Sequence, residues 1–208
     1  MPDALVLAGV LLVLAPLVGM VPVAYPPLFP VWSATREGHI TLVGAHRRAW
    51  RLLNVGFGIA TIGTAAGLAA LAVALGGDRP MAGAVTALAV GYAMAGVPWL
   101  AVLAIRARAT PALDDLGVTS APAGPAEILL GAATGGLFVA FALATGPLLV
   151  ALAVVLALTG TVAAPVAWVA ALIAAVATGS QVLTGDTVPA VLYMPTILVG
   201  IALLAGWT

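Results

Sequence analysis

The chain has 208 residues, of which 63% are hydrophobic and 7% are charged, and its mean hydropathy is +1.23. Soluble globular domains carry about 25% charged residues, so this composition excludes a soluble fold and indicates an integral membrane protein. Seven arginines balance seven acids and lysine is absent, so no basic field exists to recruit nucleic acid as a partner. Cysteine is absent as well, which excludes disulfides, thiolate nucleophiles and Cys-ligated metals.

Two long uncharged runs, residues 4–35 and 128–185, indicate how many times the chain crosses the membrane. A transmembrane helix needs roughly 20 apolar residues, because about 30 Å of hydrocarbon is spanned at 1.5 Å per residue. The second run must therefore hold two spans. The sequence predicts an all-α, six-span transmembrane helical bundle that forms one domain over residues 1–208. The spans are expected at about 4–24, 52–75, 81–105, 137–158, 166–184 and 188–206.

The first span has no basic residues before it, so we expect it to be retained rather than cleaved as a secretory signal. Four prolines between residues 22 and 30 end this span. Residues 25–32 are expected to be irregular and to lie among lipid headgroups, with Phe29 and Trp32 in an interfacial aromatic belt. The polar segment 33–51 is predicted to be an amphipathic or extended stretch on the cytoplasmic side that continues directly into the second span.

Proline, glycine and acidic residues divide the second half of the chain. Residues 109–125 are expected to form the longest polar loop, and Glu127 suits the first turn of the helix that follows. The window from 127 to 158 exceeds the membrane thickness, so we expect 126–136 to be a partly interfacial lead-in and Pro147 to kink the helix. A polar hairpin at residues 180–187 separates the last two spans.

The arginines are distributed asymmetrically. Six of them fall in the loops that follow spans one, three and five, and Arg79 alone falls on the opposite side. The positive-inside rule places the six in the cytoplasm. We therefore expect a multi-pass protein of an inner or plasma membrane with both termini outside the cytoplasm, and with any chemistry on its cytoplasmic face.

Two sequence segments match the small-xxx-small pattern that lets helix backbones approach closely, Gly63–Gly67 and Gly131–Gly135. Such matches arise by chance in a chain rich in alanine and glycine. Two interpretations therefore remain open: ordinary packing inside the bundle, and a face for another membrane-protein subunit. Membrane lipids are the other expected partner.

A set of polar residues is expected near the cytoplasmic interface. Asn54 is interpreted as an interhelical hydrogen-bond donor, and Asp186 as a cap of the last hairpin or a partner of an arginine. The alternative is a cavity lined by these groups, with Tyr92, Pro98 and Trp99 as its wall. The expected polar cluster consists of Arg47, Arg48, Arg51, Asn54 and Gln181.

His39 and His46 are the two histidines, and seven residues separate them. On one helix they would share a face but stand about 10 Å apart along the axis, too far to bind the same metal ion. Both flank arginines near the membrane surface, so a solvated interfacial face is the preferred interpretation. We expect no metal and no cofactor.

The sequence lacks the motifs of common hydrolases, which limits the functions to be considered. None of its three serines lies in a Gly-x-Ser-x-Gly setting, and no His-Glu-x-x-His is present. The preferred prediction is a small non-catalytic membrane protein, either an accessory or structural subunit of a membrane complex or a lipid-binding bundle. One alternative is an enzyme that protonates an isoprenoid or lipid, with Asp186 or Glu127 as the acid. The other is a small carrier or channel.

Overall fold

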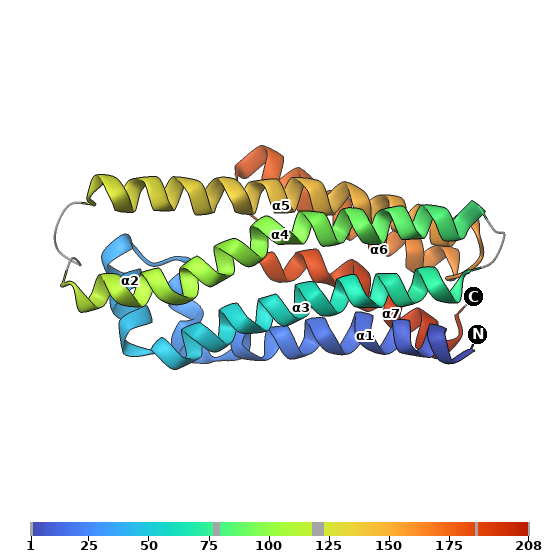
Figure 1. Ribbon diagram of the computed structural model, residues 1–208, viewed down its shortest axis with the longest axis horizontal. Helices are drawn as coiled ribbons and strands as arrows, with labels where there is room; N and C mark the ends of the chain where they lie inside the picture. Colours follow the sequence, from blue (N-terminus) through green and yellow to red (C-terminus); the bar gives the residue numbers. More distant parts are fainter. Residues whose placement is uncertain (1, 77–79, 118–122, 186, 208) are drawn as a thin grey trace.

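The computed structural model describes residues 2–76, 80–117, 123–185 and 187–207. Over these residues the chain forms helices and short turns, without a β-strand, which confirms the all-α prediction. The long helices run side by side as an elongated bundle, and the two termini lie at the same end of it (Figure 1).

Five helices of the described chain are long and apolar enough to cross a membrane. They are α1 (Pro2–Met20), α3 (Arg47–Ala74), α4 (Pro80–Asp115), α5 (Pro125–Leu158) and α6 (Ala164–Thr184). Five of the predicted spans therefore have a matching helix, and the multi-pass membrane character of the chain is supported. The predicted sixth span, 188–206, is divided into a 3-10 helix, η3 (Pro189–Tyr193), and a shorter helix, α7 (Met194–Ala205).

The segment after α1 differs from the prediction. Two 3-10 helices, η1 (Val21–Ala24) and η2 (Pro26–Trp32), occupy the region where residues 25–32 were expected to be irregular. Both begin with proline in their first turn. Proline fixes φ near −65° and has no N–H to donate, which suits the start of a tight helical turn.

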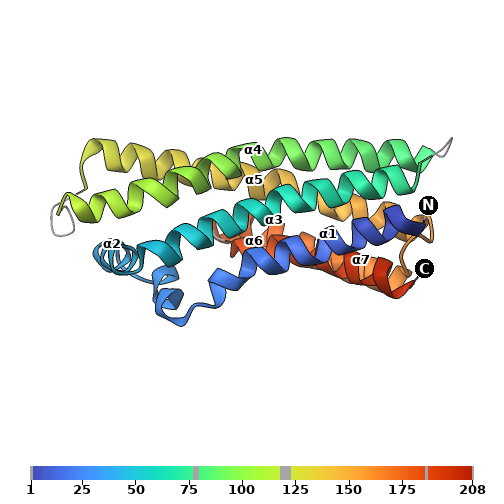
Figure 2. The ribbon, with the colours of Figure 1, turned by 60° about the horizontal axis from the view of Figure 1, so that its bottom comes forward.

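The polar segment before the second span forms its own helix, α2 (Arg36–Ala45). The Thr35 side chain caps its N-terminus by accepting a hydrogen bond from the Gly38 amide at 3.3 Å. The chain leaves helical geometry at His46 and re-enters it at Arg47, so α2 and α3 are separate helices rather than one continuous segment. Figure 2 shows α2 nearly end-on while α3 and α4 run across the view, so α2 lies across the bundle axis.

Helices α4 and α5 are longer than predicted. At 1.5 Å per residue they measure about 54 Å and 51 Å, well beyond the ~30 Å of hydrocarbon. The expected polar loop 109–125 is wrong for residues 109–115, because α4 continues to Asp115. Residues 126–136 belong to the same helix as the fourth predicted span, 137–158, and α5 remains helical through Pro147.

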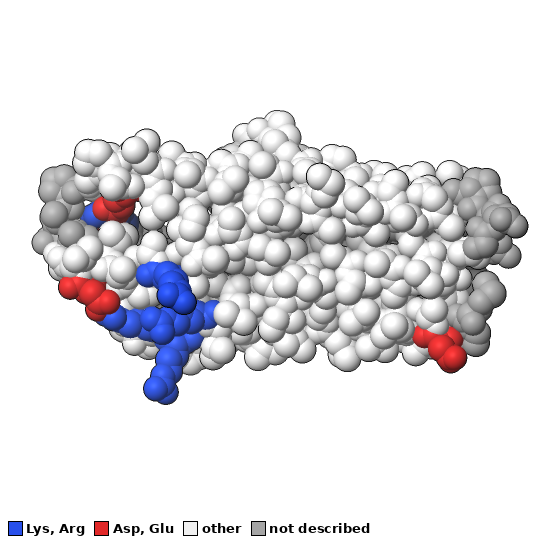
Figure 3. Space-filling view, in the orientation of Figure 1, with Lys and Arg blue, Asp and Glu red and all other residues white. Residues whose placement is uncertain are grey.

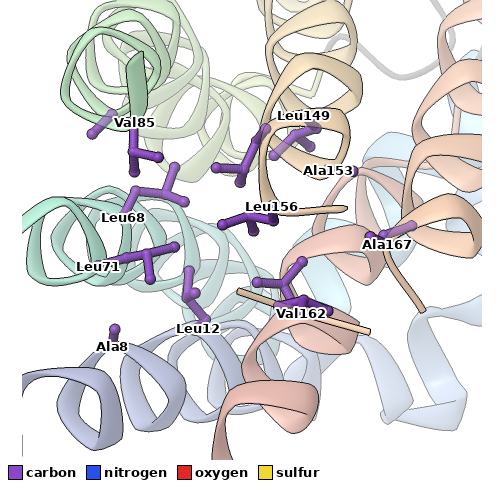
Figure 4. Packing of buried hydrophobic residues seen from close by; sticks show 14 of the residues in the cluster. Ala8, Leu12, Leu68, Leu71, Val85, Leu149, Ala153, Leu156, Val162 and Ala167 are labelled. Atoms are coloured by element: carbon purple, nitrogen blue, oxygen red, sulfur yellow. The ribbon is translucent and has the colours of Figure 1, made fainter. Parts of the chain in front are cut away.

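The bundle core contains two clusters of buried apolar side chains. Figure 4 shows one of them, where Leu12 of α1 and Leu68 of α3 meet Leu149 and Leu156 of α5. Aromatic rings dominate the other cluster, in which Trp99 stacks on Phe141 with 5.4 Å between ring centroids. Large apolar side chains are also exposed along the outside of α1, α3, α4, α5 and α6, as expected of a surface in contact with lipid.

The two glycine patterns have different surroundings. A Cβ added at Gly63 would overlap the Cβ of Ala15, and one added at Gly67 would lie 2.9 Å from the Leu12 side chain. Gly63–Gly67 therefore serves packing inside the bundle, where it brings α3 close to α1. In contrast, a Cβ added at Gly131 or Gly135 would meet nothing within 4 Å.

Candidate functional site

The charged side chains gather at the end of the bundle formed by α2 and the adjoining ends of α3, α4 and α5. Figure 3 shows basic and acidic atoms together at that end, an uncharged middle, and acidic atoms at the opposite end. The arginines of the described chain all belong to the first group. They are Arg36, Arg47, Arg48, Arg51, Arg106 and Arg108.

The five residues expected to form a polar cluster do not form one network. Arg47 pairs with Asp114 at 2.9 Å and Asp115 at 2.6 Å, which joins the start of α3 to the end of α4. Arg48 and Arg51 are exposed. Within the described chain no hydrogen bond or ion pair connects any two of the five.

Asn54 and Gln181 are both buried. The Asn54 amide donates to the Trp50 carbonyl oxygen at 2.8 Å, within its own helix, so the predicted interhelical hydrogen bond is not observed. Neither amide atom of Gln181 has a hydrogen-bond partner among the described residues. These two side chains are part of the bundle interior rather than of its charged end.

Of the two acids considered for catalysis, only Glu127 lies within the described residues. Asp186 lies outside the described residues. Glu127, in the first turn of α5, accepts two hydrogen bonds from Arg36, from Nε at 2.6 Å and from Nη2 at 2.5 Å. Such a bidentate pair is strong and directional. It fastens α2 to α5 across 91 residues of sequence.

Arg106 occupies an unusual position near the end of α4. Its guanidinium carbon lies 4.9 Å from the ring centroid of Trp50 and 5.9 Å from that of Trp32. The Trp50 Nε1 donates to the Arg106 carbonyl oxygen at 2.8 Å. Among the described residues no carboxylate lies within ion-pair distance of this guanidinium.

The sequence reasoning placed Arg106 only at the end of a span and missed this role. One signal was available: Arg106 lies at the end of a predicted span, in a chain whose Trp32 is expected at a membrane interface. Contact among the three depends on tertiary packing of η2, α3 and α4.

The two histidines lie in different surroundings. His39 of α2 donates from Nδ1 to the Val31 carbonyl oxygen at 3.2 Å, and its ring meets Trp50 edge-on with 5.3 Å between centroids. Burial lowers the pKa of His39 below its usual value of 6.5, and the positive charge of Arg106 lowers it further. His46 instead packs edge-on against Tyr25. In the part of the chain that the structure describes, no group of three His, Cys, Asp or Glu side chains could hold a metal ion.

A cavity of about 210 Å³ lies between α2, the end of α4 and the start of α5. Figure 3 shows a hollow at this end of the molecule with charged atoms visible inside it. The walls combine charged, hydroxyl and apolar side chains. The lining residues are Arg36, His39, Ile40, Ile105, Arg106, Ala109, Thr110, Leu113, Glu127, Leu130, Gly131 and Thr134.

The length of α4 allows the cavity to be compared with the thickness of a bilayer. About 38 Å of helix separates Met81 from Arg106 along α4, which is longer than the ~30 Å hydrocarbon core and close to the ~40 Å of a bilayer with its headgroup regions included. Trp32, which contacts Arg106, is 44% exposed, as is typical of an interfacial belt tryptophan. Asp115 lies about 14 Å farther along α4.

The expected cavity wall of Tyr92, Pro98 and Trp99 is not part of this cavity. Trp99 is fully buried in the aromatic core cluster, where its Nε1 donates to the Tyr193 hydroxyl at 3.1 Å. The Tyr193 and Thr61 hydroxyls are 2.7 Å apart. These groups join α3, α4 and the end of η3.

Comparison of the chain with protein families, curated proteins and solved structures found no match. The function is therefore argued from the site itself.

Proposed function

We propose that this protein is a non-catalytic membrane bundle that binds a membrane lipid in the cavity between α2, α4 and α5. The observation that supports this best is the composition of the cavity: charged and hydroxyl groups beside Ile40, Leu113 and Leu130, at a level that we take to be that of the lipid headgroups. Lipids are the amphipathic molecules available at that depth. A volume of about 210 Å³ suits a headgroup, with the acyl chains lying along the apolar exterior of the bundle.

The acid-catalysis alternative has less support. A general acid must hold its proton until it meets the substrate. The two hydrogen bonds from Arg36 stabilise the charged form of Glu127, which does not suit that role. A carrier or channel is also less well supported, because the charged residues of the described chain lie near helix ends rather than at mid-span.

One observation favours the accessory-subunit alternative. Gly135 and Gly136, which do not line the cavity, leave open space beside α5, since an added Cβ at each would meet nothing within 4 Å. A helix of another subunit could approach closely there. In that case Gly136→Leu should release a co-purifying protein in a native gel, whereas Gly179→Leu, at an equally open glycine of α6, should not.

We propose further that the chain crosses a plasma or inner membrane six times, with both termini outside the cytoplasm. The sixth crossing would consist of η3 and α7, which together extend about 28 Å. The shared end of the two termini (Figure 1) and the collection of arginines at the opposite end support this orientation.

Lipid binding can be tested by native mass spectrometry of the protein released from mild detergent. Gly131 lines the cavity and Gly135 lies one turn farther along α5, outside the lining, yet both have open surroundings. Gly131→Phe should fill the cavity and abolish lipid adducts, and Gly135→Phe should retain them. Equal retention by both variants, or no adduct on the wild-type protein, would contradict the proposal.

A further inference from the structure

Resting on the proposed function, we infer that the cavity selects an anionic phospholipid, whose phosphate binds the guanidinium of Arg106. Three features of the described chain support this inference: the charge balance of the cavity, the free donors of Arg106, and the absence of a free carboxylate among the residues that line the cavity.

The charge balance of the cavity leaves one cation uncompensated. Its charged lining residues are Arg36, Arg106 and Glu127. Glu127 is committed to Arg36 through two hydrogen bonds, and the acids near the end of α4 are committed to Arg47. Arg106 therefore retains its positive charge in a partly buried site. A charge removed from water is stabilised when an opposite charge pairs with it.

The guanidinium of Arg106 is oriented by its contacts with tryptophan. Its central carbon lies over the rings of Trp50 and Trp32, and indole rings offer its N–H groups no oxygen or nitrogen acceptor. None of these N–H groups donates to another residue of the described chain. A planar edge with parallel N–H donors matches two phosphate oxygens.

The cavity also discriminates against zwitterionic lipids. The choline of phosphatidylcholine carries a positive charge next to the phosphate, and it would need an anion nearby. Glu127, the single acid of the lining, is already occupied by Arg36. A lipid with net negative charge brings a phosphate for Arg106 and no cation that needs a partner.

The experiment uses the full-length protein in nanodiscs of phosphatidylcholine alone or of equal parts phosphatidylcholine and phosphatidylglycerol. Native mass spectrometry gives the ratio of the two lipids that stay bound after release. A further arm adds inorganic phosphate to the phosphatidylcholine nanodiscs, which separates a lipid headgroup from a free phosphate ion as the ligand. Arg108→Gln is the matched control, because Arg108 is exposed, lies two residues from Arg106 and does not line the cavity.

The wild-type protein should retain phosphatidylglycerol over phosphatidylcholine by about tenfold or more, as expected of hydrogen bonds to a charged group. Arg106→Gln should abolish this preference and Arg108→Gln should keep it. If Arg106→Gln does not fold, Arg106→Lys supplies the test: it keeps the charge, loses the parallel donors, and should show a reduced preference.

The inference is overturned if wild-type adducts show no preference, if Arg106→Gln keeps it, or if Arg108→Gln loses it equally. It is also overturned if the wild-type protein in phosphatidylcholine nanodiscs retains inorganic phosphate as well as it retains phosphatidylglycerol in the mixed nanodiscs. Each of these results leaves lipid binding itself intact, provided that Gly131→Phe still removes the adducts. The proposed function itself would be rejected if the lipid preference were lost and Gly131→Phe also failed to remove the lipid adducts.

Discussion

The indole of Trp50 contacts Arg106 in two ways: its Nε1 donates to the Arg106 carbonyl oxygen at 2.8 Å, and its ring centroid lies 4.9 Å from the guanidinium carbon. The first contact fixes α3 against α4, and the second orients the charged group at the cavity. Trp50 is fully buried, so both contacts depend on the packing of this end of the bundle.

Substitutions at Trp50 should separate these two contacts. Trp50→Phe keeps an aromatic face and loses the donor, so the free energy of unfolding should fall by about 1 kcal/mol while the preference for anionic lipid is largely kept. Trp50→Leu removes the aromatic face as well and should lower that preference. Thermal unfolding in detergent and the lipid-retention ratio measure the two effects. Identical behaviour of both variants in both assays would argue against separate roles.

Close packing of α1 on α3 should make Gly63 sensitive to size. Gly63→Leu would place a side chain where the Ala15 Cβ lies, and overpacking of this kind costs about 1–3 kcal/mol. Gly67→Leu should behave similarly. Gly135→Leu, in open space, should leave Tm unchanged or raise it, because leucine favours helix more than glycine does. Differential scanning fluorimetry measures the three Tm values, and equal shifts would contradict the packing described here.

Protonation of His39 should make the stability of the folded protein depend on pH. Its pKa in the folded protein is lowered by burial and by Arg106 of α4, and Arg36 and Glu127 line the same cavity. As the pH falls, His39 of the unfolded chain therefore takes up a proton near pH 6.5, whereas His39 of the folded chain takes it up only at a lower pH. Stability contributed by neutral His39 is present above pH 6.5 and is lost as the pH falls below that value.

The measurement is Tm between neutral and mildly acidic pH for the wild-type protein and for His39→Gln. Glutamine keeps a donor for the Val31 carbonyl oxygen but does not titrate. The wild-type Tm should fall more steeply on acidification than that of the variant. Parallel curves would show that another group dominates this pH range.

The orientation of the chain can be checked with reporters that are active in the cytoplasm. A reporter fused after Thr208 should be silent, and one inserted at Gly117, between α4 and α5, should be active. The reverse pattern would contradict the orientation proposed from the arginines. Activity at both sites would instead contradict the sixth crossing.

Composition and the length of apolar runs were enough to predict the helical class and the positions of five long helices. Their ends were less predictable. Residues 109–115 were predicted to be part of a polar loop. Instead, α4 continues to Asp115, and Asp114 and Asp115 pair with Arg47, which is more than 60 positions away in sequence. The last span was predicted as one helix, whereas Pro189 and Pro195 each lie in the first turn of a separate helical segment.

The site was harder to predict than the fold. Arg47, Arg48 and Arg51 were grouped because they are neighbours in sequence, but a shared helix end does not give them shared partners. Arg106 of α4 contacts Trp32 of η2 and Trp50 of α3. These contacts form between segments far apart in sequence, so no local sequence pattern predicts them. The ion pair of Arg36 with Glu127 likewise joins two residues that sequence reasoning treated separately.

The central claim is that the cavity between α2, α4 and α5 holds a lipid headgroup. Photolabelling tests it most directly, with a phospholipid that carries a diazirine in its headgroup, followed by peptide mapping of the protein labelled in nanodiscs. Labels should concentrate in residues 36–40, 105–113 and 127–134, and Gly131→Phe should remove them. Labels spread evenly over the exposed headgroup-level residues, or unchanged in Gly131→Phe, would contradict the claim.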